Sequence, residues 1–245
     1  MGKPMGCSMK QKAAKYITNV AVLLFALVLA AKLAGPAALR LYIESGIGDC
    51  KKIPILCMEP AQQIINPDIN KECILESLPY NFEKLSICVP KGFTVIQERI
   101  KKVYYKKREH ERNGPVIYLL YEKPDFFVNL YPQLKKEGIK DNYEFVKRIM
   151  FANLHKMNSL SDAFFVIMKS IFTPDLGGQK NVVMAEFNTE AFRGFINYNL
   201  SKPNQYFDCN IINKEGGYFK IYIKDKGASL DLNKVLAIIS SVKEI

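Results

Sequence analysis

The sequence predicts an α+β protein in which one N-terminal transmembrane helix is followed by a largely antiparallel sheet flanked by helices. Three observations predict this fold class. Residues 16–31 form an uncharged, strongly apolar run near the N-terminus. Between residues 82 and 224, short segments alternate apolar and polar side chains as half-buried strands do. The chain then closes with apolar residues at helical spacing: Leu232, Val235, Leu236, Ile239 and Val242.

The N-terminal apolar run is long enough to cross a membrane. It reads YITNVAVLLFALVLAA, and it extends to residue 34 if Lys32 carries its ammonium group to the lipid headgroups. A helix needs roughly 20 apolar residues, and about 17 at the least, to span the hydrocarbon core. We therefore expect a signal anchor at residues 16–34 that contacts the lipid bilayer. Cleavage by signal peptidase at the small residues of Val28-Leu29-Ala30 is the alternative, and it would give a secreted protein.

The charge distribution predicts the orientation of this segment. Residues 1–40 contain no acid and account for +6 of the net charge of +11, through Lys3, Lys10, Lys12, Lys15, Lys32 and Arg40. Four of these lysines precede the apolar run, so the positive-inside rule predicts a cytoplasmic basic N-terminus at residues 1–15 and a cell-membrane protein with its C-terminal domain outside the cytoplasm. Because most of the basic excess lies in this leader, nucleic acid is not an expected partner.

Four cysteines lie close together in residues 35–82 and just beyond. Residues 41–82 contain four prolines, and we expect residues 35–82 to form a linker or small subdomain with one short helix near Glu59–Ile65. Clustered cysteines in an exported chain indicate disulfides, and three connectivities are open, of which Cys50–Cys57 with Cys73–Cys88 joins local pairs. Buried free thiols are the alternative. A metal site is not expected, because the cluster has neither a close C-x-x-C pair nor a neighbouring histidine.

From residue 83 onward the pattern predicts one extracytoplasmic α+β domain, residues 83–245. Asn113-Gly114 is a hairpin signal. A first helix begins at the capping residue Asp141 and continues its apolar face to Met157, and a second covers Ser161–Phe172. The strands are expected at Leu85–Val89, Phe93–Lys107, Pro115–Lys123, Phe126–Tyr131, Val182–Asn188, Ala191–Leu200, Phe207–Asn213 and Tyr218–Lys224.

Residues 83–245 resemble the PsbP-like domains, which are named for an extrinsic subunit of photosystem II. The resemblance rests on the opening Val89-Pro90-Lys91-Gly92-Phe93, the run of hairpins, and the closing helix Ser229–Ile245 after the last strand. It implies an antiparallel sheet flanked by helices, in an extracytoplasmic accessory or assembly factor. It implies binding rather than catalysis, and it assigns no site residue.

The chain carries few residues that predict chemistry. His110 lies in a charged hairpin tip and His155 on a predicted helix, and no motif supplies either histidine with a nucleophile or a ligand partner. We therefore expect no catalytic site and no cofactor. A basic run interleaved with Tyr104 and Tyr105 is a candidate surface for an anionic partner. Its basic residues are Lys101, Lys102, Lys106, Lys107, Arg108 and Arg112.

These observations predict a membrane-anchored, extracytoplasmic binding or accessory protein. Its expected partners are the bilayer and an envelope protein or anionic envelope component. Two alternatives remain at this point. One is an envelope enzyme, such as a hydrolase, whose family the sequence does not reveal, and the other is a structural envelope protein that oligomerises through a sheet edge.

Overall fold

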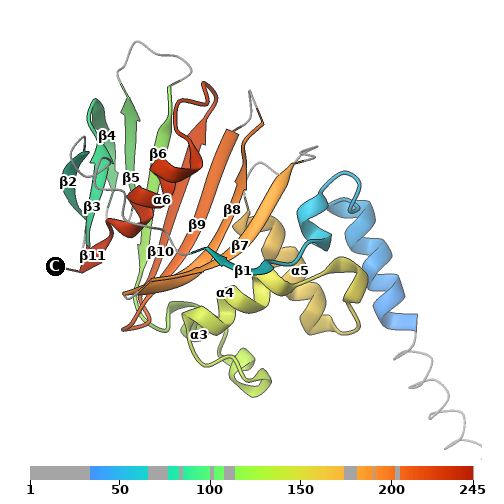
Figure 1. Ribbon diagram of the computed structural model, residues 1–245. Coiled ribbons are helices and arrows are strands. Elements are labelled where there is room, and N and C mark those ends of the chain that lie inside the picture. Colours follow the sequence, from blue (N-terminus) through green and yellow to red (C-terminus); the bar gives the residue numbers. More distant parts are fainter. Residues whose placement is uncertain are drawn as a thin grey trace, which may run out of the picture.

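The computed structural model describes residues 34–65, 77–82, 85–99, 102–107, 114–173, 181–189, 191–201 and 205–244 (Figure 1). Its centre is an eight-stranded sheet with the order β1-β7-β8-β9-β10-β6-β5-β4. The strands are β1 (Ala61–Ile65), β4 (Phe93–Arg99), β5 (Lys102–Lys107), β6 (Val116–Glu122), β7 (Val182–Asn188), β8 (Phe192–Asn199), β9 (Gln205–Asn213) and β10 (Tyr218–Asp225). Neighbouring strands pair antiparallel, except that β1 pairs parallel with β7.

A small second sheet and the last helix cover one face of the large sheet. The small sheet has the order β11-β3-β2, formed by β2 (Ser77–Phe82), β3 (Leu85–Pro90) and β11 (Lys243–Glu244). Helix α6 (Leu232–Ser240) begins at Asp231, whose side chain caps it, and lies across β6 and β10 in Figure 1. Its apolar side, including Val235 and Ile239, packs with Ile87 of β3 and the inward residues of β9 and β10 in one core.

The other face carries a helical layer made of α3 (Phe126–Leu130), α4 (Asn142–Phe151) and α5 (Leu160–Phe172), with 3-10 turns η2 (Pro132–Glu137) and η3 (Leu154–Lys156). Phe127, Phe145 and Phe195 belong to the core that joins this layer to the sheet. Residues 34–46 are helical and lead into the turn η1 (Pro54–Cys57). A third apolar cluster, which includes Ile43, Leu56 and Val166, packs this N-terminal part against α5.

The predicted α+β class is present, but the predicted transmembrane helix has to be corrected. Among the described residues, no helix is long and apolar enough to cross a membrane. Of the expected span at residues 16–34, residues 16–33 lie outside the described part of the chain, and residue 34 already belongs to the helix that packs beside α5 through Ile43. The corrected fold class is an α+β domain with an eight-stranded, mostly antiparallel sheet between two layers.

Most strand predictions from residue 182 to residue 224 are confirmed within two residues, and the capping role of Asp141 is confirmed by its bond from the Glu144 amide at 2.8 Å. The expected strand at residues 93–107 is instead a hairpin, in which Phe93 pairs with Lys107 and Arg99 with Lys102. The sequence between these two strands has no Asn-Gly or Gly pair that would signal a turn, so one continuous strand was the simplest interpretation.

Three further element predictions are wrong for identifiable reasons. The expected helix at residues 59–65 is strand β1, because the free edge of β7 offers backbone partners and tertiary pairing overrides local propensity. The expected strand at residues 126–131 is helix α3, in which the adjacent side chains of Phe127 and Val128 are both buried. The helix expected to run to residue 157 ends at residue 151, because Asn153 caps the separate turn η3.

Candidate functional site

The helix-layer face of the large sheet presents rows of lysines and tyrosines across three neighbouring strands. Tyr222 of β10 pairs in register with Tyr118 of β6, and Tyr118 pairs with Tyr104 of β5. In the register rows on either side of these tyrosines, β5 and β10 each contribute a lysine, and β6 contributes Leu120 or Val116 between them. We call these nine register positions the Lys/Tyr face: Lys102, Tyr104 and Lys106 on β5, Leu120, Tyr118 and Val116 on β6, and Lys220, Tyr222 and Lys224 on β10.

The described side chains of this face are partly open to solvent. Tyr118, Tyr222 and Lys224 are each half-buried. The rings of Tyr118 and Tyr222 lie 5.6 Å apart, and Tyr206 of β9 extends the row with its ring 6.5 Å from that of Tyr222. Aromatic rings that face one another across a sheet form a rigid, amphipathic surface, with an apolar body and a polar hydroxyl.

The predicted basic patch therefore divides between two sides of a strand. Lys102 and Lys106 occupy the Lys/Tyr face, whereas Lys107, one position further along β5, pairs with Phe93 on the opposite side of the pleat. Lys101, Arg108 and Arg112 lie outside the described residues. The sequence alone did not indicate that Lys220 and Lys224 join Lys102 and Lys106, because two strands far apart in the chain bring them together.

A buried ion pair anchors one end of this face. The Lys220 Nζ lies 3.0 Å from the Asp208 Oδ1, and it also donates to the main-chain carbonyl of Phe172 at the end of α5. Burial raises the pKa of Asp208, and the ammonium of Lys220 opposes that shift. The Tyr218 hydroxyl donates to the Asn210 Oδ1 at 2.7 Å beside the pair, and burial raises the pKa of Tyr218 well above its ordinary value. These contacts tie β9 and β10 to α5.

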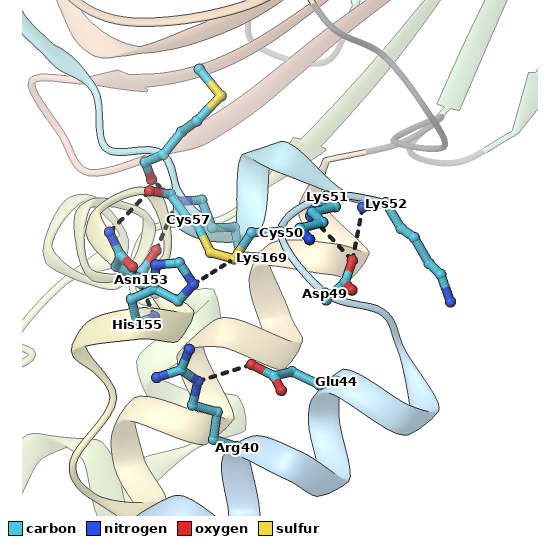
Figure 2. The surroundings of a disulfide bond; sticks show 12 residues. Arg40, Glu44, Asp49, Cys50, Lys51, Lys52, Cys57, Asn153, His155 and Lys169 are labelled. Carbon is cyan, nitrogen blue, oxygen red and sulfur yellow. Dashed lines mark hydrogen bonds and ion pairs between the residues drawn. A yellow bond between two sulfur atoms is a disulfide. The ribbon is translucent and has the colours of Figure 1, made fainter.

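A second polar region, the disulfide corner, lies where the N-terminal segment meets the helical layer (Figure 2). We define it as residues 49–59 with residues 150–156 and Lys169. The predicted Cys50–Cys57 disulfide is present, with the two Cα atoms 5.7 Å apart. The predicted partner pair is not tested, because Cys73 lies outside the described residues; Cys88 is half-buried and forms no disulfide with any residue that the structure describes.

His155 points at this disulfide from the turn η3, as Figure 2 shows. Its Nε2 lies 3.3 Å from the Cys50 Sγ, although 105 positions separate the two residues in sequence. The expectation that the cysteine cluster has no neighbouring histidine is therefore wrong. The Sγ atoms of Cys50 and Cys57 and a ring nitrogen of His155 all lie within 4.8 Å of one another. Only the fold brings His155 beside the cysteines, and no sequence motif predicts this contact.

Hydrogen bonds fix η3 against the disulfide loop. The Asn153 side-chain amide donates to the Cys57 carbonyl at 3.0 Å and to the Glu59 Oε1 at 3.1 Å, while its carbonyl accepts from the His155 amide at 3.0 Å. Lys156 forms an ion pair with Glu59 at 2.7 Å, and this contact holds the pKa of Glu59 below its ordinary value. One asparagine thus joins the cysteine loop to the histidine.

Lys169 of α5 fastens the same two segments from inside the protein. Its side chain is fully buried, and its Nζ donates to three main-chain carbonyls: Met58 at 2.6 Å, Met150 at 2.7 Å and Ala152 at 2.8 Å. Burial lowers the pKa of Lys169 to about 7, and the carboxylate of Glu59 opposes this shift. A lysine on an otherwise apolar helix face gave no sequence signal of this role.

Comparisons with known proteins assign no family. No family model and no curated protein matches the chain. A solved structure from Bacteroides thetaiotaomicron VPI-5482 aligns at 7% identity with a TM-score of 0.32, covering 66% of this chain and 45% of that one. This chain therefore spans less than half the length of that protein. The molecule is defined by its own fold, an α+β domain with a mixed eight-stranded sheet, and the resemblance to PsbP-like domains stays a prediction.

Proposed function

We propose that this chain is an extracytoplasmic binding or accessory domain that takes an anionic component of the cell envelope on its Lys/Tyr face. The single observation that carries the proposal is the strand register. It places Lys102 and Lys106 of β5 and Lys220 and Lys224 of β10 on the same face of the sheet, on either side of a row of tyrosines.

This arrangement suits an acidic partner of extended shape. Clustered cations raise the local concentration of a polyanion and speed its encounter with the protein. The tyrosines add contact area at little cost in conformational entropy, since each ring has two side-chain torsions. The Lys220 ammonium is partly neutralised by the Asp208 carboxylate.

The compartment is part of the same proposal. Disulfides form and persist in oxidising environments and are rare in the cytosol of mesophiles. The Cys50–Cys57 disulfide therefore supports a location outside the cytoplasm.

Charge reversal on the face tests the proposal. We would measure the retention of the full chain on immobilised dextran sulfate, as a plain polyanion, at increasing salt. Lys224→Glu should weaken binding about tenfold at low salt, since a lysine near an anionic surface contributes about 1 kcal/mol and reversal also adds repulsion. The matched control is Lys136→Glu on η2, which is an exposed lysine with the same change of net charge.

The two variants separate a built surface from general attraction. The Lys/Tyr face is supported if Lys224→Glu binds dextran sulfate markedly more weakly than the unmodified chain while Lys136→Glu binds it about as well. Equal losses in both variants would show that binding follows net charge alone, and the proposal would then be abandoned.

A further inference from the structure

The disulfide corner brings together three side-chain atoms that metal ions prefer. Two sulfur atoms and one imidazole nitrogen, from Cys50, Cys57 and His155, lie within 4.8 Å of one another. The Cys50 Sγ and the His155 Nε2 are 3.3 Å apart. In a tetrahedral zinc site, Zn–S and Zn–N bonds of about 2.3 and 2.0 Å separate neighbouring ligand atoms by about 3.5–3.8 Å. The histidine is therefore already near the distance from the cysteine that shared coordination requires.

Contacts other than the disulfide also hold this corner together. Asn153 joins the Cys57 carbonyl to the His155 amide, and Lys169 bonds the carbonyls of Met58 and Ala152 on the two segments. Leu56, inside the cysteine loop, is fully buried in the cluster that includes Ile43. These contacts therefore still hold the Cys57 segment beside the His155 turn when the sulfur–sulfur bond is opened.

The corner is also open to reagents. Cys50 and Cys57 are half-buried and His155 is exposed. A small dithiol or a metal ion can therefore reach this corner without unfolding of the domain. Three protein ligands with one open position is a common arrangement of protein zinc.

We propose that the reduced disulfide corner is a binding site for a thiophilic divalent cation of the Zn²⁺ class, with Cys50, Cys57 and His155 as its ligands. The corner then has two states. In the oxidised state the two sulfurs bond to each other, and in the reduced state they bond to the metal.

The two states interconvert by thiol–disulfide exchange and metal binding. A small-molecule or protein dithiol transfers two electrons and two protons to the disulfide, so that it becomes a disulfide itself while Cys50 and Cys57 become thiols. Zn²⁺ then binds both sulfurs as thiolates together with the neutral imidazole, and two protons leave to solvent. When the metal leaves, Cys50 and Cys57 take two protons back from solvent and become thiols. Transfer of their two electrons and two protons to an external disulfide, which becomes a dithiol, then restores the original bond.

Co²⁺ and Zn²⁺ titrations of the full chain test this proposal. The protein is reduced with a phosphine, the reductant is removed without oxygen, and Co²⁺ is added while thiolate-to-cobalt charge-transfer absorption is recorded. We expect one Co²⁺ per chain, its displacement by Zn²⁺, release of two protons, and no absorption from the oxidised chain. His155→Ala should weaken binding about tenfold or more, because one of three ligands is lost.

Two controls keep other cysteines from producing the result. Cys88→Ser removes a thiol outside the corner and should bind as the unmodified chain does, whereas Cys57→Ser should lose the charge-transfer band. Because His155 is exposed, His155→Ala should keep the far-ultraviolet circular dichroism of the fold, and His155→Gln provides a second variant of closer size. Absence of binding after reduction would overturn the proposal, as would binding that is unchanged in both His155 variants.

Discussion

Raising the pH from 7 to 9 should stabilise the folded protein through Lys169. In the folded state, burial lowers the pKa of this lysine to about 7, whereas in the unfolded chain it returns to its ordinary value of about 10.4. Below pH 7 both states carry the proton, and above about pH 10.4 neither does. Between these limits the unfolded chain binds more protons than the folded one, so the free energy of unfolding rises with pH.

The size of the effect follows from the same two pKa values. Full linkage adds about 1.4 kcal/mol per pH unit, and the folded group is only half titrated at pH 7, so the gain from pH 7 to pH 9 is about 2 kcal/mol. Lys169→Met removes the titrating group and leaves the carbonyls of Met58, Met150 and Ala152 without their donor. Each buried acceptor that loses its partner costs about 1–3 kcal/mol.

Urea denaturation of the two proteins at pH 7, 8 and 9 measures the effect. Groups that titrate in both proteins, such as the buried thiol of Cys209, cancel in the difference between them. The free energy of unfolding of the unmodified chain, minus that of Lys169→Met, should grow by about 2 kcal/mol over this range. A difference that is constant with pH would refute the reasoning, because it would show that Lys169 keeps its proton when the chain folds.

Three further predictions concern stability. Gly194→Ala should lower the free energy of unfolding by about 2 kcal/mol or more, because the added methyl group meets the backbone of β9. The control Gly46→Ala has open space around it and should change that free energy by no more than about 0.5 kcal/mol. Equal melting temperatures for the two variants would contradict the close approach of Gly194 to β9. Asp208→Asn should cost about 3 kcal/mol by leaving Lys220 without its carboxylate, and adding Lys220→Met should recover part of the loss in chemical denaturation. Reducing the disulfide, which spans a sequence separation of seven, should lower the free energy of unfolding by about 2–3 kcal/mol; an unchanged urea midpoint would count against the loop-closure estimate.

Regular alternation predicted the second half of the sheet well. In β10, Phe219, Ile221 and Ile223 are buried while Lys220 and Tyr222 are less so, as their period of two indicates. The prediction failed where tertiary contacts decide. Residues 61–65 carry no strong strand pattern, and they become a strand because β7 has an unpaired edge beside them.

The candidate sites were predictable only in their local parts. Cys50–Cys57 is a pair close in sequence, and Lys102 and Lys106 stand two positions on either side of Tyr104. The partners of these residues come from far along the chain. His155 reaches the disulfide because α4 ends early, and the lysines of β10 join those of β5 through the pairing of both strands with β6. One sequence contains no signal for such pairings before the topology is known.

The parallel pairing of β1 with β7 affects how readily the protein can associate with other chains through the edge of its sheet. Unpaired edge strands are templates for association with other chains, and natural proteins cover or disrupt them. β7 is seven residues long, and its Val183 side chain is 39% exposed. Strand β1 occupies the outer edge of β7, and the buried turn residues Ile55 and Leu56 hold the segment just before it in place. Residues 34–65 thus cover the edge of β7 and limit aggregation through it. Any fragment that begins after residue 65 would expose β7 as an open edge strand.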